Sequence, residues 1–334
     1  MGSKYLKTLG ELIEQTKSAP QIPYVWSGIK EGSFGFVFGP SKSGKTTFCE
    51  NMALSLIAGK ESFFGKKLSK GPHRVLFVSL EEFYRERTLR NIRQLSQLEI
   101  NLPPLNYLSN GEEFPRLLST KLDWEKLESL IKESKAKIVF IDSMSRLYDG
   151  SIEESKLAKK ILYQLRELTN RLKVTMIVIH HTPKMNGSPI TIDSLAGSRM
   201  LAQEADFLIG VNRTINGMTY VKEVAFRYAA ENTELVTPFS INSNSWLSPQ
   251  KPCREYSLIG DLDGRISNVN TMKVLEVIKL LETKSDVVKY KDIETEAEKV
   301  GVARSTIFEQ LKKLTARGEI IKVVKGQYQT VLEK

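Results

Sequence analysis

Short apolar runs alternate with amphipathic stretches over most of this chain. The apolar runs cover residues 34–38, 75–79, 138–141, 174–179 and 207–211. Stretches with apolar residues at helical spacing, such as 47–57 and 156–172, lie between them. Nearly continuous runs of Val, Ile and Phe that are separated by helices are typical of a parallel sheet covered on both faces. The predicted fold class is therefore α/β, with a mostly parallel sheet.

Changes in composition divide the chain into four predicted segments. Residues 1–32 hold a short helical pattern that prolines interrupt, and they are predicted to be a lead-in that packs on the core. The core covers residues 33–244, and residues 245–270 are rich in Ser, Pro, Gly and Asp, which is typical of a linker. Residues 271–334 show three helical patterns followed by a hairpin, and this order predicts a winged helix-turn-helix domain.

The overall composition excludes several classes of protein. With 41% apolar and 26% charged residues, the chain has the composition of a globular protein. No apolar run approaches the ~18 residues of a membrane span, and the N-terminus lacks a secretory pattern, so we expect no membrane partner and a cytoplasmic location. Two cysteines and three histidines are too few for a disulfide framework or a clustered metal site, so no structural metal is expected.

The net charge of the chain is +10. Summed positive charge attracts polyanions, which makes nucleic acid the first candidate partner. The basic residues are spread along the chain, so a solvated basic surface explains the same charge equally well.

One loop carries a complete phosphate-binding pattern. Residues 39–46, GPSKSGKT, match GxxxxGK[ST] at each fixed position, between a predicted strand and a predicted helix. Glycines at positions 39 and 44 let the backbone curl so that successive N–H groups point at phosphate oxygens. Lys45 is predicted to reach the β- and γ-phosphates and Thr46 to ligate Mg²⁺, so ATP and Mg²⁺ are the expected cofactors. The predicted nucleotide-binding residues are Gly39, Ser41, Ser43, Gly44, Lys45, Thr46 and Thr47.

Acidic residues follow two of the predicted strands. Asp142 ends the run at 138–141, a pattern that places a carboxylate beside the magnesium, although by itself it also suits a helix N-cap. Glu81 and Glu82 follow the strand at 75–79. A carboxylate in this position is the usual base that orients the attacking water, with Glu81 as the first choice and Glu82 as the second. Both also suit the first turn of a helix, where they would complement its dipole.

Two histidines, His180 and His181, end the strand at 174–179. A histidine at this edge of the sheet can hydrogen-bond a γ-phosphate or its water. Because side chains alternate along a strand, one of the pair must point to the opposite face. A histidine satisfied by hydrogen bonds in the core is the alternative.

Several segments together resemble one known family. They are PYVWSGIKEGSFGFVFGPSKSGKTT, LFVSLEE, IVFIDSMSRL, VIHHTPK and LAGSRMLAQEADFLIGVNR. These segments resemble the hexameric RecA-like ATPases of the plasmid RepA helicase type and, more distantly, the DnaB-like replicative helicases and RecA/RadA recombinases. The resemblance covers roughly residues 23–227 and implies a RecA-like P-loop core. The appended winged helix is not part of the RepA-type plan.

The resemblance also implies roles for individual residues. It makes Glu81 the catalytic carboxylate and His181 the sensor of the γ-phosphate. Rings of this family share active sites between subunits, and Arg213 lies where the family places an arginine that acts in trans. The alternatives for the trans role are Lys184, Arg199 and Arg227.

Two loops and the C-terminal domain are predicted to contact DNA. Arg146 and Lys184 lie in loops that would line the channel of a ring around single-stranded DNA. Residues 303–325 form the most basic part of the tail, and their helix is predicted to expose Thr306, Gln310 and Lys313 opposite its apolar face. The basic residues predicted to contact duplex DNA there are Arg304, Lys312, Lys313 and Arg317. Ordinary surface loops, and a winged helix that docks on protein, are the alternatives.

These patterns predict an ATP- and Mg²⁺-dependent oligomeric ATPase that acts on DNA, as a helicase or translocase in replication or mobile-element maintenance. The expected assembly is a homo-oligomer, which the resemblance makes a hexameric ring. An ATP-switched DNA-binding regulator and a recombinase-like filament protein are the alternatives.

Overall fold

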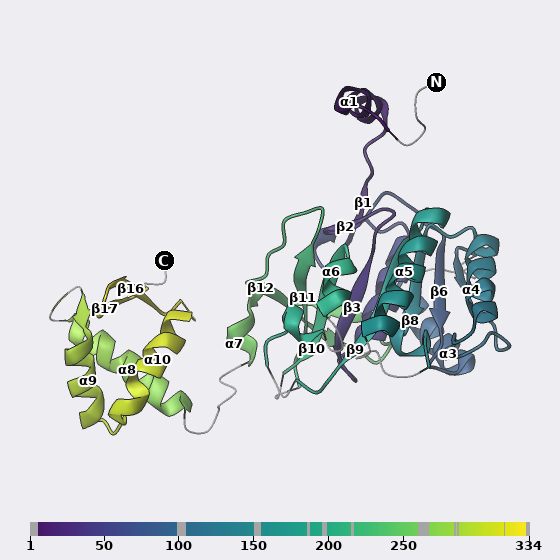
Figure 1. Cartoon of the computed structure of the whole chain (residues 1–334). Coiled ribbons are helices and arrows are strands. Elements are labelled where there is room, and N and C mark those ends of the chain that lie inside the picture. Colours follow the sequence, from purple (N-terminus) through teal and green to yellow (C-terminus); the bar gives the residue numbers. More distant parts are fainter. Residues whose placement is uncertain are drawn as a thin grey trace. The chain divides into compact units, whose positions relative to one another are not determined.

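The computed structural model describes residues 6–98, 105–149, 155–185, 188–195, 199–214, 217–259, 267–283, 285, 287–316 and 318–331. The chain divides into two compact units, Met1–Arg254 and Glu255–Lys334, which are described separately (Figure 1). Within the described ranges, no helix has both the length and the apolar character needed to cross a bilayer.

The first unit is built from a large sheet and helices on both of its faces. Its strands are β1 (Tyr24–Trp26), β2 (Ile29–Lys30), β3 (Phe34–Pro40), β4 (Ser62–Phe63), β5 (Lys66–Lys67), β6 (Val75–Ser79), β7 (Tyr107–Ser109), β8 (Ile138–Asp142), β9 (Thr175–Thr182), β10 (Phe207–Arg213), β11 (Thr219–Phe226), β12 (Leu235–Ile241), β13 (Leu247–Pro249) and β14 (Cys253–Arg254). Its helices are α1 (Leu9–Ser18), α2 (Lys45–Ile57), α3 (Tyr84–Leu95), α4 (Lys121–Ser134), α5 (Ser155–Leu172) and α6 (Arg199–Glu204). The five apolar runs predicted as strands correspond to β3, β6, β8, β9 and β10.

Six neighbouring strands of the large sheet run parallel, in the order β10-β3-β9-β8-β6-β7. Beyond β10 the sheet continues with antiparallel β11, β12 and β13, and β14 also pairs with β12. The predicted α/β class with a mostly parallel sheet is confirmed. Since the carboxyl ends of parallel strands meet at one edge, the residues after β3, β6, β8 and β9 are brought together there.

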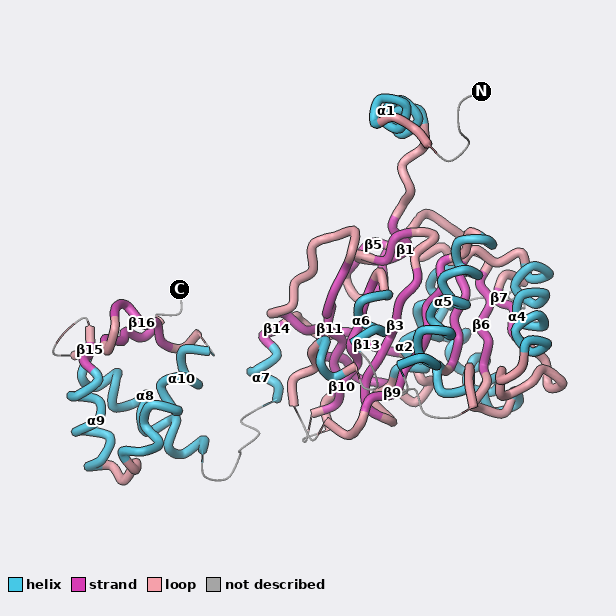
Figure 2. Tube along the Cα trace, viewed as in Figure 1, coloured by secondary structure: helices cyan, strands magenta, loops and turns pink. Residues whose placement is uncertain are grey.

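The two faces of the sheet are covered by different helices, which Figure 2 shows in cyan against the magenta strands. Phe48 and Met52 of α2 share a core with Ile177 of β9. On the other face, the Thr169 hydroxyl of α5 contacts the sulfur of Met176 at 3.8 Å. Adjacent residues of a strand point to opposite faces, so both faces of β9 are buried, which explains its uninterrupted apolar run.

The N-terminal segment differs from its prediction. Every residue of α1 is exposed, so this helix does not pack on the core as expected. A capping box between Thr8 and Glu11 closes its first turn instead. The core begins at β1, where Trp26 is buried and its indole N–H donates to the Phe63 carbonyl at 2.7 Å.

The predicted linker at 245–270 is wrong at its start, because β13 and β14 are part of the large sheet. Leu247 pairs with Ile241, and its N–H donates to the Asn51 side chain at 2.8 Å. Two-residue and three-residue strands with prolines on a sheet edge carry almost no periodic signal, so their composition resembles that of a linker. The described chain becomes helical again at α7 (Glu255–Ile259) and α8 (Ser267–Glu282).

The second unit combines helices with a small antiparallel sheet. After α7 and α8 come β15 (Val288–Lys289), α9 (Tyr290–Lys299), α10 (Arg304–Ala316), β16 (Ile320–Val324) and β17 (Gln327–Thr330). The sheet has the order β15-β17-β16. Residues of α8, α9 and α10, among them Ile278, Ile293 and Leu311, form one core with Val288 and Tyr328.

Candidate nucleotide and catalytic site

The loop between β3 and α2 has the geometry of a phosphate cradle. At Gly39 an added Cβ would lie 1.9 Å from the Val211 carbonyl oxygen, so only glycine lets β10 approach this closely. Gly44 is the N-cap of α2 and has a φ of 90°, in the left-handed region. The loop therefore ends at a helix N-terminus, where N–H groups and the helix dipole favour an anion.

Two polar groups of this loop, the Lys45 ammonium and the Ser43 hydroxyl, are buried. The Lys45 ammonium donates to the Pro40 carbonyl at 2.7 Å, and the side chain of Ser43 is buried with no hydrogen-bond partner among the described residues. Burial lowers the pKa of Lys45 to about 8, against the opposing effect of Asp142 and Glu81. Phosphate oxygens would satisfy both groups.

The remaining predicted residues of the loop lie at its rim. Ser41 is exposed, and Thr47 is half-buried in the first turn of α2. Their assignment to nucleotide binding stays a prediction.

Thr46 and Asp142 form a pair of oxygen donors beside the loop. The Thr46 hydroxyl donates to Asp142 Oδ2 at 2.7 Å, whereas the buried Oδ1 has no partner among the described residues. Burial raises the pKa of Asp142 to about 6. An orphaned carboxylate oxygen next to a hydroxyl fits Mg²⁺, which prefers oxygen ligands from one or two side chains together with phosphates. These residues thus suit the expected metal.

Glu81 lies next to this pair at the end of β6. Its carboxylate accepts hydrogen bonds from the hydroxyls of Ser143 and, at 2.8 Å, Ser145, and it contacts His181 Nε2 at 3.3 Å. The hydrogen bond with His181, followed by those from the two serines, lowers the pKa of Glu81 to about 2 although burial opposes the shift. Glu81 is therefore ionised at neutral pH and can accept a hydrogen bond from water. The sequence analysis missed the two serines, of which Ser143 directly follows Asp142 and Ser145 comes two residues later.

The site thus brings together residues that are far apart in sequence. Ligand atoms of Glu81, Asp142 and His181 lie within 4.8 Å of one another. The parallel pairing of β6, β8 and β9 causes this, since Ser79 is opposite Asp142 and Asp142 is opposite Ile179.

Of the two neighbouring glutamates and the two neighbouring histidines, only one of each pair faces the site. Glu82 does not face the cluster but accepts a hydrogen bond from Arg90 Nη1 at 2.6 Å. His180 is buried with its ring 6.1 Å from that of Phe36, whereas His181 faces Glu81. The structure therefore places Glu81 and His181 at the site, in agreement with the alternation of side chains along β9.

The candidates for the trans-acting basic residue lie at different places in the structure. Arg213 is exposed at the end of β10, on the same edge as the phosphate loop, and its Nε donates to the Gly217 carbonyl at 3.2 Å. Arg227 lies at the opposite edge, where it pairs with Asp206 at 3.3 Å. Lys184 is exposed after β9, and the side chain of Arg199 is outside the described residues.

The residues predicted to contact DNA differ in their exposure and in their partners. Arg146 and Lys184 are exposed in loops that follow β8 and β9. In the second unit Lys312 is exposed, Lys313 is half-buried, and Arg304 is paired with Glu294 at 2.8 Å. Arg317 lies outside the described residues.

The prediction that Gln310 lies on the exposed face of α10 is wrong. Gln310 is buried, and it accepts a hydrogen bond from the Thr271 hydroxyl at 2.5 Å. At 100° per residue, position 310 is only about 60° away from the buried Ile307 and Leu314 side of the helix, not opposite it. The exposed residues of α10 include Phe308 and Lys312.

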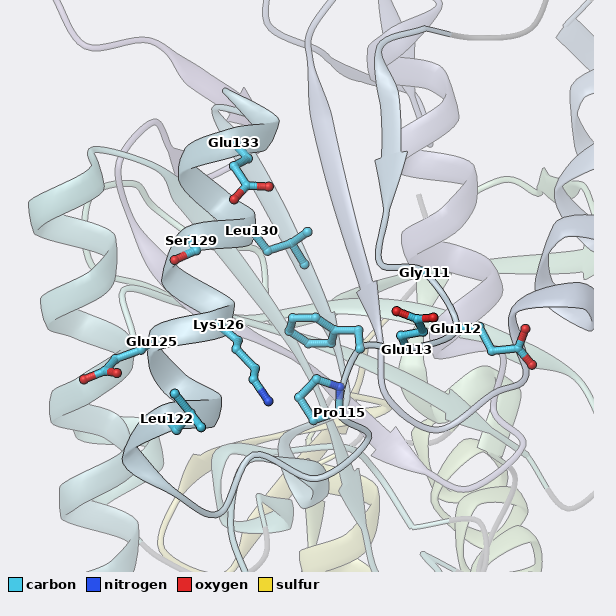
Figure 3. A pocket seen from close by; sticks show the side chains of 11 residues that line it. Gly111, Glu112, Glu113, Pro115, Leu122, Glu125, Lys126, Ser129, Leu130 and Glu133 are labelled. Carbon is cyan, nitrogen blue, oxygen red and sulfur yellow. The ribbon is translucent and has the colours of Figure 1, made fainter.

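Figure 3 shows a separate hollow between α4 and the loop at 111–115. The charged residues that line it are Glu112, Glu113, Glu125, Lys126 and Glu133. An excess of carboxylates repels phosphate groups, so this hollow does not suit a nucleotide or the backbone of DNA.

The fold and the site together define a P-loop ATPase, in which the phosphate loop connects a central parallel strand, β3, to helix α2. A family model described as AAA domain matches residues 6–187, more than half of the chain, and the chain belongs to this family. Among solved structures, the KaiC-like protein of the hyperthermophilic archaeon Pyrococcus horikoshii OT3 is similar, with 18% identity, a TM-score of 0.49, and coverage of 69% of this chain and 100% of that chain. None of the curated proteins matches the chain.

We expect Glu81→Gln to bind ATP but to hydrolyse it at least ~100-fold more slowly, because glutamine cannot accept the proton of the attacking water. Steady-state turnover and binding of an ATP analogue measure the two effects. Glu86→Gln, an exposed change on α3, is the matched control. A loss of this size in Glu82→Gln together with normal turnover in Glu81→Gln would show that the base is the neighbouring residue.

Proposed function

We propose that this chain is an ATP- and Mg²⁺-dependent motor that assembles into a ring and moves on DNA, as a helicase or translocase. The observation that carries this proposal is the convergence of Lys45, Asp142 and Glu81 at one sheet edge, with exposed Arg146 and Lys184 in the loops that follow β8 and β9. These two loops directly continue the strands that carry Asp142 and His181. DNA bound there would be coupled to the nucleotide site through a few residues of backbone.

The proposed reaction uses each group of the site in one role. The loop N–H groups and Lys45 bind the phosphates, and Thr46 with Asp142 would hold Mg²⁺, which neutralises charge on the phosphate oxygens when it is bound. Glu81 orients a water for in-line attack and takes up its proton, which its ionised carboxylate can accept. His181 hydrogen-bonds Glu81, and in the proposed reaction it responds to loss of the γ-phosphate.

We further propose that the second unit is a winged helix that binds duplex DNA. Helices α8, α9 and α10 and the antiparallel β16–β17 hairpin support this interpretation. Lys312 on α10 and Lys322 and Lys325 on the hairpin are all exposed, in the two elements that contact phosphates in such domains.

Strand displacement tests the motor. A forked DNA with a labelled strand is incubated with the protein, Mg²⁺ and ATP, and release of the strand supports a helicase. ATP-dependent displacement of a protein block from the DNA, without strand release, supports a translocase. Stable DNA binding that depends on ATP, without strand release and without displacement of the protein block, would support a switch-type regulator instead. Images of the complex with an ATP analogue distinguish rings from filaments.

Changing Lys312, Lys322 and Lys325 together to alanine should weaken binding to duplex DNA and reduce the magnitude of the slope of log affinity against log salt by about 3, because fewer counterions are released. Titrations at several salt concentrations measure both quantities. Alanine at Lys279, Lys289 and Lys291, which are also exposed in the second unit, removes the same charge and is the matched control. Equal losses in both variants would indicate a diffuse effect of charge, and unchanged binding in both would indicate a unit that docks on protein.

A further inference from the structure

The helix that follows the phosphate loop contains a fully buried carboxylate that the proposed reaction does not use. Glu50 of α2 has no exposed surface. Two nitrogens of Arg90, from α3, donate to its oxygens at 2.7 Å each, and Gln94 donates at 3.0 Å. A buried charge is tolerated only with such partners. The three donors therefore satisfy the oxygens of the buried Glu50 carboxylate and fix the guanidinium against α2.

The same guanidinium also holds the residue next to the catalytic glutamate. Arg90 Nη1 donates to Glu82 Oε1 at 2.6 Å, and its Nη2 donates to Glu82 Oε2. The planar fork of arginine thus bridges α2 and the turn after β6. Glu82 is one peptide bond from Glu81, so its position restricts the backbone from which the Glu81 carboxylate extends.

The other side of Glu81 is held just as closely. Asn110 accepts from the Ser79 N–H at 2.8 Å and donates to the Ser79 carbonyl at 3.0 Å. The Leu80 N–H donates to the Asp142 carbonyl at 2.7 Å. Glu81 is therefore fixed before and after its own position, while its side chain extends to the cluster with Asp142 and His181.

We propose that Arg90 is a positioning residue for ATP hydrolysis, which acts by holding Glu82, and through it Glu81, at a set distance from the phosphate loop. This inference rests on the proposed role of Glu81. A purely stabilising role explains the geometry less well, because buried ion pairs are often replaced by apolar residues without loss of stability. A shift of about 1 Å in a catalytic group, by contrast, can lower a rate up to ~10²-fold.

Glu82→Ala is the sharpest test, because it cuts the link to Glu81 and leaves the Arg90–Glu50 pair intact. We expect kcat to fall ~10-fold, with KM for ATP and the Kd for a non-hydrolysable analogue changed less than about twofold. Glu86→Ala on α3 removes an equal charge and should leave kcat unchanged. Arg90→Ala should reproduce the loss, and Arg93→Ala is its control on the same helix.

A double-mutant cycle separates positioning from other effects. In the Glu81→Gln background, single-turnover rates should be the same with and without Glu82→Ala, since the residue acts only through Glu81. Equal fold-losses in both backgrounds, or a large rise in the nucleotide Kd of the Glu82 or Arg90 variants, would overturn the positioning role. A wild-type protein that does not hydrolyse ATP would overturn the proposed function itself.

Discussion

Replacing Lys45 by alanine is expected to lower ATP turnover at least ~10³-fold and to remove most nucleotide binding, because the ammonium group supplies charge to the phosphates in ground state and transition state. Lys45 is buried at the start of α2 and, without phosphates, is held by a backbone carbonyl. Its loss removes a buried cation and does not disturb the apolar core, so the fold should remain. ATP turnover, analogue binding and a thermal melt measure the three parts of this prediction.

A substitution in the same loop provides the control for Lys45→Ala. Lys42 is exposed and has a φ of 62°, a conformation that asparagine tolerates. Lys42→Asn therefore removes one positive charge from the loop without changing its backbone, and turnover should stay within about twofold. Normal turnover in Lys45→Ala itself would contradict the assignment of this loop as the ATP site.

Arg213→Ala is expected to lower turnover by roughly 10³-fold, because a guanidinium inserted from a neighbouring subunit stabilises the charge on the transferring phosphoryl group. Arg213 is exposed at the end of β10, on the edge that carries the phosphate loop. Arg227→Ala is the control, since Arg227 pairs with Asp206 at the opposite edge and should not affect catalysis.

Mixing two inactive proteins tests whether Arg213 acts in trans. Subunits with Arg213→Ala and subunits with Glu81→Gln are each nearly inactive, but a mixed assembly can combine an intact Glu81 with an intact Arg213 at one interface. Recovered ATP turnover on mixing supports a shared site. Mixed assemblies confirmed by mass spectrometry that stay inactive would show that Arg213 does not act across subunits.

The strands and the phosphate loop were predictable because their signals are local. Strands such as the run at 138–141 lie between helices and are buried on both faces, so every residue in the run is apolar. The phosphate loop is one contiguous segment whose glycines and lysine all act on one ligand. The parallel order of the strands then placed Asp142 and the residues after β6 and β9 at one edge, as expected.

Short edge strands and helix faces were harder to predict. The strands β13 and β14 have three and two residues, and both owe their place to pairing with β12, whose partner residues lie 6 to 10 positions from those of β13 and 17 to 19 positions from those of β14. Gln310 resembles an exposed residue by type, yet its partner Thr271 lies 39 positions earlier in the chain. In both cases the environment of these residues is decided by a partner outside their own segment.

The sequence by itself determined the α/β class, the phosphate loop and the acidic and histidine residues at the strand ends, because periodicity and motif spacing are properties of neighbouring residues. Only the tertiary structure decided that Glu81 joins Asp142 and His181 while Glu82 turns to Arg90. Glu81 and Glu82 are the same residue type in the same turn, so local propensity does not distinguish them. The partners that separate them come from α2, α3, β8 and β9, which meet only when the sheet is assembled.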